Sequence, residues 1–173
     1  MTDGGTLQVT ANGEREIVMT RTFNAPRKLV WEAFTKPELL KRWLLGPPGW
    51  TLAVCEINLK VGGCYRYVWR RESDGFEMGM GGVYREIVVP ERIVATERFD
   101  EAWYPGEGLG TVALVEQDGK TKLTQTLLYE SRDARDGVLK SPMEKGVGMS
   151  YDRLAEVLAS LGTRGMEKGA GEP

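Results

Sequence analysis

Large aromatic and thioether side chains recur at every second position in two neighbouring segments, residues 64–71 and 76–89. They are Tyr65, Tyr67, Trp69, Met78, Met80 and Tyr84. Alternate residues of a β-strand point to the same face of a sheet. Such a face can line a cavity in which tyrosine hydroxyls orient a hydrophobic or amphipathic small molecule. It can equally fill a protein core, because methionine adapts as readily to a gap as to a ligand.

Carboxylates on predicted strands are the candidate groups for acid–base chemistry, and they are Glu86, Glu97 and Glu130. A carboxyl group on the inward face of a strand can exchange protons with a bound substrate. Strand carboxylates more often pair with an arginine or face solvent. We therefore assign no catalytic residue from the sequence, and an enzyme is the less favoured interpretation.

The chain contains no histidine. This excludes Ser–His and Cys–His nucleophilic pairs and removes the commonest ligand of transition metals. Cys55 and Cys64 alone make a poor zinc site, so no metal and no cofactor are expected. In the predicted hairpin, Cys55 lies opposite about Tyr67 and Cys64 opposite about Asn58, which is too far apart for a disulfide. We expect two free, largely buried thiols, as in a reducing compartment.

Further aromatic residues lie in or beside loops rich in glycine and proline, where functional sites are common. They are Trp43, Trp50, Trp103 and Tyr104. These side chains can ring a cavity mouth, form a surface for a partner, or simply anchor their loops. The C-terminal helix described below adds an inward stripe. The predicted ligand-binding residues are Trp43, Trp50, Tyr65, Tyr67, Trp69, Met78, Met80, Tyr84, Trp103, Met143, Val147 and Tyr151.

The elements that must position these residues are mostly strands. Seven segments have the alternation, β-branched content or turn boundaries of strands. They span residues 14–23, 51–59, 64–71, 76–89, 92–101, 110–117 and 121–130. Consecutive strands joined by short turns predict an antiparallel meander and an α+β fold.

Two short helices are predicted to interrupt this meander between Phe23 and Trp50. Pro26 suits a first helical turn, and Pro37 both ends the first helix near Thr35 and opens the second. Their apolar residues are interpreted as structural, and only the segment from Trp43 onwards is expected to sense a ligand. The residues interpreted as structural are Leu29, Val30, Phe34 and Leu40.

The final helical segment is predicted to begin near Ser131, to break before Pro142, and to end at Gly162. Its apolar residues recur at steps of three and four: Met143, Val147, Tyr151, Leu154 and Leu158. Gly146 and Gly148 lie inside it, at a cost of about 0.5–1 kcal/mol each relative to alanine. We interpret them as sites of close packing against the sheet. The alternative is that they leave volume for a cavity.

The length of 173 residues predicts one domain, assigned to residues 14–161. Residues 1–13 are predicted to be a flexible lead, although Asn12-Gly13 can equally turn a hairpin into the next strand. Residues 162–173 are predicted to be a disordered tail. A net charge of −2 does not favour nucleic-acid binding. No apolar run approaches the roughly 20 residues of a membrane span, and no signal peptide is recognisable, so we expect a cytoplasmic location.

Four local motifs occur in an order typical of one family. They are Phe23-Asn-Ala-Pro26-x-x-x-Val30-Trp31, Arg42-Trp43…Gly46-Pro47-Pro48, Val61-Gly62-Gly63 and Gly82-x-Tyr84-x-Glu86-Ile87. From about residue 15 to residue 161 the chain resembles bacterial homologues of the activator of the heat-shock-protein-90 ATPase. These belong to the START-like, birch-pollen-allergen-like (SRPBCC) superfamily. The resemblance implies a helix-grip fold of order β-α-α-β6-α. In this fold a curved, seven-stranded antiparallel sheet wraps a long C-terminal helix, with an apolar cavity between them.

Superfamily relatives include lipid-transfer proteins, hormone receptors, aromatase/cyclases and a co-chaperone, so the fold alone does not select a function. The leading hypothesis is binding of a hydrophobic or amphipathic small molecule in the cavity. The second is a cofactor-free enzyme, such as a cyclase, dehydratase or hydrolase, that uses the same cavity. The third is a co-chaperone-like interaction module. It is not favoured, because the extra domain and linker of the eukaryotic co-chaperone are missing. A homodimer is compatible with all three hypotheses.

Overall fold

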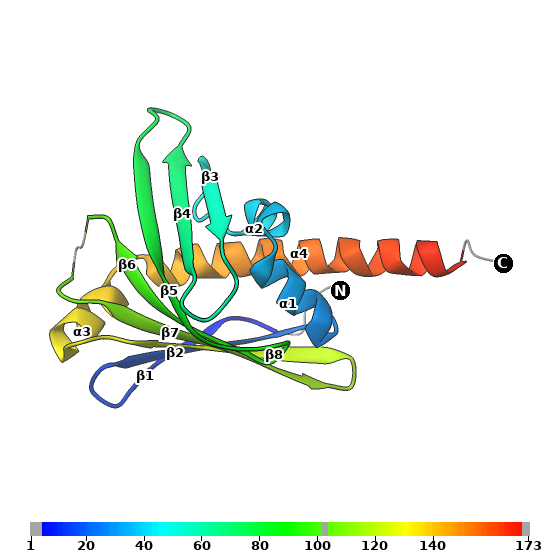
Figure 1. The fold of residues 1–173 in the computed structure, drawn as a ribbon, viewed down its shortest axis with the longest axis horizontal. Helices are drawn as coiled ribbons and strands as arrows, with labels where there is room; N and C mark the ends of the chain where they lie inside the picture. The colour runs from blue at the N-terminus through cyan, green and yellow to red at the C-terminus, as the bar shows by residue number, and fades with distance from the viewer. Residues whose placement is uncertain (1–4, 102–103, 171–173) are drawn as a thin grey trace.

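The computed structural model describes residues 5–101 and 104–170, with side chains to residue 162 (Figure 1). Its strands are β1 (Gln8–Asn12), β2 (Glu16–Phe23), β3 (Trp50–Ile57), β4 (Cys64–Arg71), β5 (Glu77–Val88), β6 (Arg92–Phe99), β7 (Gly108–Gln117) and β8 (Lys120–Leu128). Its helices are α1 (Arg27–Thr35), α2 (Pro37–Trp43), α3 (Arg132–Lys140) and α4 (Met143–Ala170).

All strand pairs are antiparallel, and the strands lie in the order β1-β2-β8-β7-β6-β5-β4-β3. The first and last predicted strands, β2 and β8, are therefore neighbours. The sheet is strongly bent, with β3, β4 and β5 rising away from the plane of β2, β7 and β8 (Figure 1). The long helix α4 runs across this bend, and α1 and α2 lie beside it. This is an α+β fold of the helix-grip type.

The core lies between α4 and the sheet. Leu154 and Leu158 of α4 are buried in one cluster with Phe23 of β2 and Leu123 of β8. Leu154 and Leu158 belong to the inward stripe that the steps of three and four residues predict for this helix. A second cluster joins the far end of β2 to α3 through Ile17, Met19, Leu127, Ala134 and Val138. The single stripe of α4 thus fixes the position of the helix over the sheet.

The two short helices form as the proline spacing predicts. Pro26 is the residue before α1, and Pro37 is the first residue of α2. Trp43 at the end of α2 is 1% exposed and donates from Nε1 to the backbone oxygen of Ala33 at 2.9 Å. This buried hydrogen bond ties α2 to α1, and the pair packs against α4 as one unit.

The strand count differs from the seven predicted. β1 pairs with β2 through a turn at Gly13, whose φ of +59° suits glycine. The hairpin alternative for the N-terminal segment therefore forms, and residues 8–12 are a strand where a flexible lead was predicted. At the other end, α4 is continuous through Gly162 to Ala170, where a helix end and a disordered tail were predicted. Gly162 keeps a negative φ, so it does not form the left-handed cap.

None of the helices in the described part of the chain is both long and apolar enough to cross a membrane.

Candidate functional site

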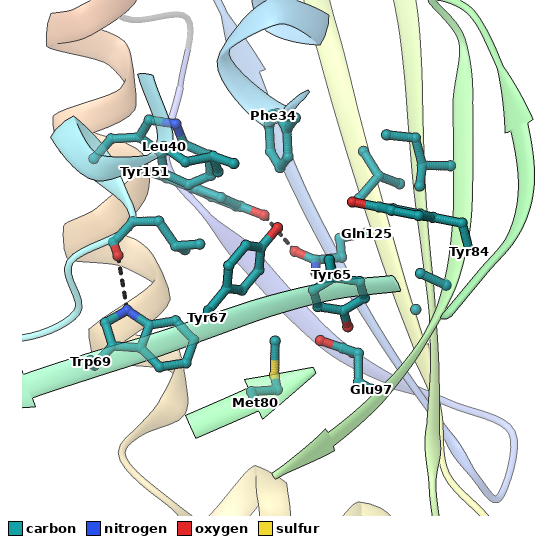
Figure 2. A pocket seen from close by; sticks show the side chains of 16 residues that line it. Phe34, Leu40, Tyr65, Tyr67, Trp69, Met80, Tyr84, Glu97, Gln125 and Tyr151 are labelled. Carbon is teal, nitrogen blue, oxygen red and sulfur yellow. Dashed lines mark hydrogen bonds between the residues drawn. The ribbon is translucent and has the colours of Figure 1, made fainter. Parts of the chain in front are cut away.

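A cavity of about 160 Å³ lies between the bent sheet, α2 and α4. Its lining residues come from β4 and β5, from β6, β7 and β8, and from the helices, which contribute residues such as Phe34 and Tyr151 (Figure 2). Most of the lining surface is carbon, and aromatic rings supply much of it. We refer to this space as the tyrosine cavity.

A second cavity, of about 300 Å³, lies beside the first and reaches toward the loop after α2. The two cavities share Leu44, Trp69 and Tyr151. The indole Nε1 of Trp69 donates to the backbone oxygen of Leu44 at 2.9 Å, as Figure 2 shows. This hydrogen bond joins β4 to the loop after α2, at the place where the two spaces adjoin. We refer to the second space as the loop cavity.

The predicted ligand-binding residues divide between the two cavities. Those that line the tyrosine cavity are Trp43, Tyr65, Tyr67, Trp69, Met80, Tyr84 and Tyr151. Those that line the loop cavity are Trp50, Trp69, Met78, Val147 and Tyr151. Met143 lies elsewhere, packed against the second core cluster with Val138 and Tyr129. Trp103 lies outside the described residues.

The pairing of β4 with β5 explains why these side chains meet. Tyr65 lies opposite Gly82, Tyr67 opposite Met80, and Trp69 opposite Met78. Along β4 the ring centroids of Tyr65 and Tyr67 are 5.0 Å apart, and those of Tyr67 and Trp69 are 5.9 Å apart. Alternation in two paired strands therefore produces one aromatic wall.

Gly82 is required at its place in this wall. A Cβ atom there would lie 1.8 Å from the backbone oxygen of Thr96 on β6. The same oxygen accepts a 2.6 Å hydrogen bond from the buried hydroxyl of Tyr65. Gly82 therefore permits a close approach of β5 to the neighbouring strand.

Of the three candidate carboxylates, only Glu97 lines the tyrosine cavity. Glu86 was predicted on the same face as Tyr84. An irregularity in the β5–β6 register between these two residues moves Glu86 to the outside, where it pairs with Arg92 at 3.5 Å. Glu130 is exposed and accepts a hydrogen bond from the backbone N–H of Glu107. A strand bulge reverses the alternation of side chains, which is why period alone misplaced Glu86.

Among the described residues that line the cavity, Glu97 carries the one acidic group, and none is a lysine or an arginine. Burial raises the pKa of Glu97 from its ordinary value of 4.5 to about 7. Burial and the nearby charge of Glu97 both raise the pKa of Tyr65 and of Tyr67 above the ordinary value of 10. The tyrosines therefore remain neutral hydrogen-bond donors near neutral pH.

Polar groups of the cavity fall into two classes. Tyr65 and Tyr151 are already engaged, since the Tyr65 hydroxyl donates to Thr96 and the Tyr151 hydroxyl donates to Oε1 of Gln125 at 2.5 Å. In the described part of the chain, the hydroxyls of Tyr67 and Tyr84 and the carboxyl of Glu97 show no hydrogen-bond partner. These three groups converge on the tyrosine cavity (Figure 2).

Gln125 is a cavity residue that the sequence predictions missed. It lies on β8 between Leu123 and Leu127, which are both buried on the inward face. A polar residue at an inward position of a strand, between apolar inward residues, can indicate a cavity or a buried hydrogen bond, because a buried polar group needs a partner. Phe34 and Leu40 also line the cavity, although they were interpreted as structural.

Gly146 of α4 lines the loop cavity, and a Cβ atom added there would meet no other atom within 4 Å. Close packing of the helix on the sheet, the preferred interpretation of this glycine, is therefore wrong. The alternative, that the missing side chain leaves cavity volume, agrees with the structure. At Gly148 the nearest atom to an added Cβ is Cδ2 of Leu7, at 3.9 Å.

Both cysteines are free, and Cys55 lies opposite Tyr67 as predicted. Cys55 is buried, and burial raises the pKa of its thiol to about 11. Cys64 is exposed, contrary to prediction, because it is adjacent to the inward Tyr65 and therefore points to the other face of β4. No cluster of three or more potential metal-ligating residues occurs in the described part of the chain.

Comparison with known proteins gives relatives of the same shape. A Rhodobacter sphaeroides protein of known crystal structure is 30% identical, with a TM-score of 0.85, over 90% of this chain and 99% of its own. A Chromobacterium violaceum protein is 28% identical, with a TM-score of 0.70, over 83% of this chain and 96% of its own. An Arthrobacter aurescens protein is 24% identical, with a TM-score of 0.78, over 90% and 93%, and supports the fold alone.

No curated protein matches the sequence. The family model described as "Activator of Hsp90 ATPase homolog 1-like protein" matches residues 24–159, from the residue after β2 to well within α4. The matched region contains α1 and α2, β3 to β8 and most of the cavity lining. The chain therefore belongs to the family of activator of Hsp90 ATPase homolog 1-like proteins.

Proposed function

We propose that the protein binds a hydrophobic or amphipathic small molecule in the tyrosine cavity and the adjoining loop cavity. The observation that carries the proposal is an aromatic and apolar wall interrupted by three converging polar groups, for which the described residues provide no hydrogen-bond partner: Tyr67, Tyr84 and Glu97. Small-molecule sites have this composition, in which apolar surface supplies affinity and a few polar groups fix orientation. A helix-grip fold of this family is consistent with such a role.

The volumes of the two cavities support a ligand larger than a few waters. The loop cavity of about 300 Å³ reaches the lower end of the roughly 300–1,000 Å³ typical of ligand sites. The tyrosine cavity adds about 160 Å³ behind the indole of Trp69. A ligand that occupied both spaces would have to pass Leu44, Trp69 and Tyr151, which line both of them. We expect a ligand to occupy the loop cavity first and to displace the indole if it is long.

The binding test uses two helical glycines that have equal room for a side chain. Gly146 faces the loop cavity, whereas Gly137 of α3 is exposed, and an added Cβ meets nothing within 4 Å at either position. A neutral fluorescent dye, N-phenyl-1-naphthylamine, is titrated into wild type, Gly146→Leu and Gly137→Leu. We expect the leucine at position 146 to weaken dye binding by about tenfold or more, because it fills the site. Gly137→Leu should bind as wild type does.

Native mass spectrometry of the protein purified from its own host provides the second readout, since a bound molecule adds a defined mass. A wild-type protein that carries no ligand and binds no dye would contradict the proposal. Equal dye binding by the two leucine variants would also contradict it, because the dye would then bind elsewhere.

A second candidate function is favoured by one observation, the inward position of Glu97. A carboxyl group whose pKa lies near 7 is suited to exchange protons with a substrate at neutral pH. The protein would then be a cofactor-free enzyme with Glu97 as its acid or base. The test is to incubate a co-purified molecule with fresh protein and follow its mass, with Glu97→Gln as the inactive control. A molecule that is bound but never converted would contradict this candidate. A chaperone contact, a homodimer and a cytoplasmic location stay predictions.

A further inference from the structure

Glu97 places a negative charge in a cavity whose other lining groups are neutral. The residues that surround it are tyrosines, and its charge contributes, after burial, to the raised pKa of each of them: Tyr65, Tyr67, Tyr104, Tyr129 and Tyr151. They come from β4, the loop before β7, the end of β8 and α4. Of these five tyrosines, Tyr65, Tyr67 and Tyr151 line the tyrosine cavity together with Glu97.

The described part of the chain supplies no cation to this carboxylate within the tyrosine cavity. Neither lysine nor arginine is among the lining residues. Arg21, which is close enough to affect the pKa of Tyr151, forms an ion pair with Asp152 at 2.7 Å. A buried carboxylate without a counter-charge is costly, and a bound cation would remove that cost.

Aromatic rings favour the same kind of ligand. The face of each ring carries negative charge, so a desolvated cation within about 6 Å of a ring centroid is attracted. The rings of Tyr65 and Tyr67 are 5.0 Å apart, and those of Tyr65 and Tyr84 are 5.5 Å apart. One cationic group beside Glu97 can therefore contact several rings, as in the aromatic cages that bind ammonium groups.

We infer that the ligand of this protein is an amphipathic organic cation, whose ammonium group lies beside Glu97 among the tyrosines and whose apolar part extends past Trp69. The inference rests on the proposed function and adds the charge of the ligand to it. A ligand with a carboxylate is disfavoured, because it would place two like charges in one apolar site. A neutral alcohol can accept or donate hydrogen bonds there but gains no ion pair.

The experiment compares three probes that share one eight-carbon chain and differ in charge: octylammonium, octan-1-ol and octanoate. Dissociation constants are measured by calorimetry at pH 8, where Glu97 is ionised, for wild type, Glu97→Gln and Glu86→Gln. Glu86 is the matched control because it lies on the outer face of the sheet and pairs with Arg92. The comparison of probes in wild type needs no variant, so the test does not depend on the folding of Glu97→Gln.

We expect wild type to bind octylammonium about tenfold or more tightly than octan-1-ol, and octanoate least tightly. Glu97→Gln should lose this preference while it still binds octan-1-ol, and Glu86→Gln should keep it. Equal binding of octylammonium and octan-1-ol by wild type, tighter binding of octanoate, or a preference that survives in Glu97→Gln would overturn the inference and leave the proposed function intact. Failure of all three probes to bind would overturn both.

Discussion

Glu97 is the residue that gives an otherwise neutral cavity its chemical character. Its position on β6 matters as much as its type, since Glu86 and Glu130 are also strand-associated carboxylates and both face outward. The bulge beyond Tyr84 leaves one inward carboxyl group where simple alternation would predict two. In the proposed function, that group sets the charge of the ligand that the cavity prefers.

The dependence of stability on pH tests the burial of Glu97. Its pKa is raised from 4.5 to about 7 on folding, so the folded state holds a proton that the unfolded state has released between these values. Unfolding free energy must therefore fall as pH rises from 4 to 8, by about 3 kcal/mol from this group. The tyrosines that surround Glu97 stay protonated throughout that range.

Urea denaturation of wild type and Glu97→Gln across this range isolates the effect, because every other carboxylate titrates in both proteins. We expect Glu97→Gln to be the more stable of the two at pH 8 and the advantage to shrink toward pH 4. A difference that does not change with pH would show that Glu97 is well solvated.

Two tyrosines of β4, Tyr65 and Tyr67, allow a hydroxyl that is hydrogen-bonded within the protein to be compared with one that, among the described residues, is not. Tyr65→Phe removes a buried hydrogen bond to the backbone oxygen of Thr96, which should cost about 1 kcal/mol. Tyr67→Phe removes a hydroxyl without a partner in the described part of the chain, so its unfolding free energy should change by less than about 0.5 kcal/mol. Thermal or urea unfolding measures both. Equal costs for the two substitutions would contradict this assignment.

Elements differ in how much room they leave at a glycine. Gly82→Ala should destabilise the protein by more than about 2 kcal/mol, because the added Cβ would overlap the Thr96 oxygen of the neighbouring strand. Gly146→Ala should stabilise it by about 0.5–1 kcal/mol, since the helix gains propensity and the methyl group enters open space. Melting temperatures of the pair measure opposite shifts. Two losses of similar size would mean that α4 packs more closely at Gly146 than described.

Elements that depend on neighbouring residues were predicted well from the sequence, and features that depend on distant segments were not. Pro37 acts on the residue beside it, so the break between α1 and α2 was predicted to the residue. Alternation, β-branched content and turn boundaries together predicted the strands β2 to β8, and all of these are local signals. The bulge after Tyr84 was not predicted, since it depends on how β5 pairs with β6 rather than on either sequence alone.

The candidate site was predicted less completely than the fold. Alternation identified the aromatic wall of β4 and β5, but it gave no means to choose Glu97 over Glu86. The two cavities adjoin at Leu44, Trp69 and Tyr151, so their division depends on side-chain rotamers and on the path of the loop after α2. Rotamers and loop paths are set by contacts between distant segments, which no local pattern contains.

At the scale of the whole molecule, the buried guanidinium of Arg21 links the sheet to α4. Arg21 of β2 is 3% exposed, its Nη1 lies 2.7 Å from Oδ1 of Asp152 on α4, and its guanidinium lies 5.2 Å from the ring centroid of Phe23. Removal of the anionic partner leaves this buried charge less well compensated. The pair therefore contributes more than a surface ion pair does.

Asp152→Asn should lower the unfolding free energy by about 1–3 kcal/mol, a range below that of fully buried pairs because Asp152 itself is largely exposed. Glu156→Gln, one turn further along α4 and exposed, is the control and should change it by less than about 0.5 kcal/mol. Chemical denaturation at low and high salt measures both. An Asp152→Asn protein as stable as the control would show that the helix is held by its apolar stripe alone.

The pairing of β2 with β8 also determines when the protein can fold during its synthesis. Ile17 and Phe23 of β2 are fully buried, yet the strand that flanks them begins only at Lys120 and the helix that covers them at Met143. At about 5–20 residues per second, a ribosome needs roughly 5 to 30 seconds to deliver those segments. Throughout that interval the nascent β1–β2 hairpin presents an uncovered apolar face, and it is the part of the new chain that most needs protection from aggregation.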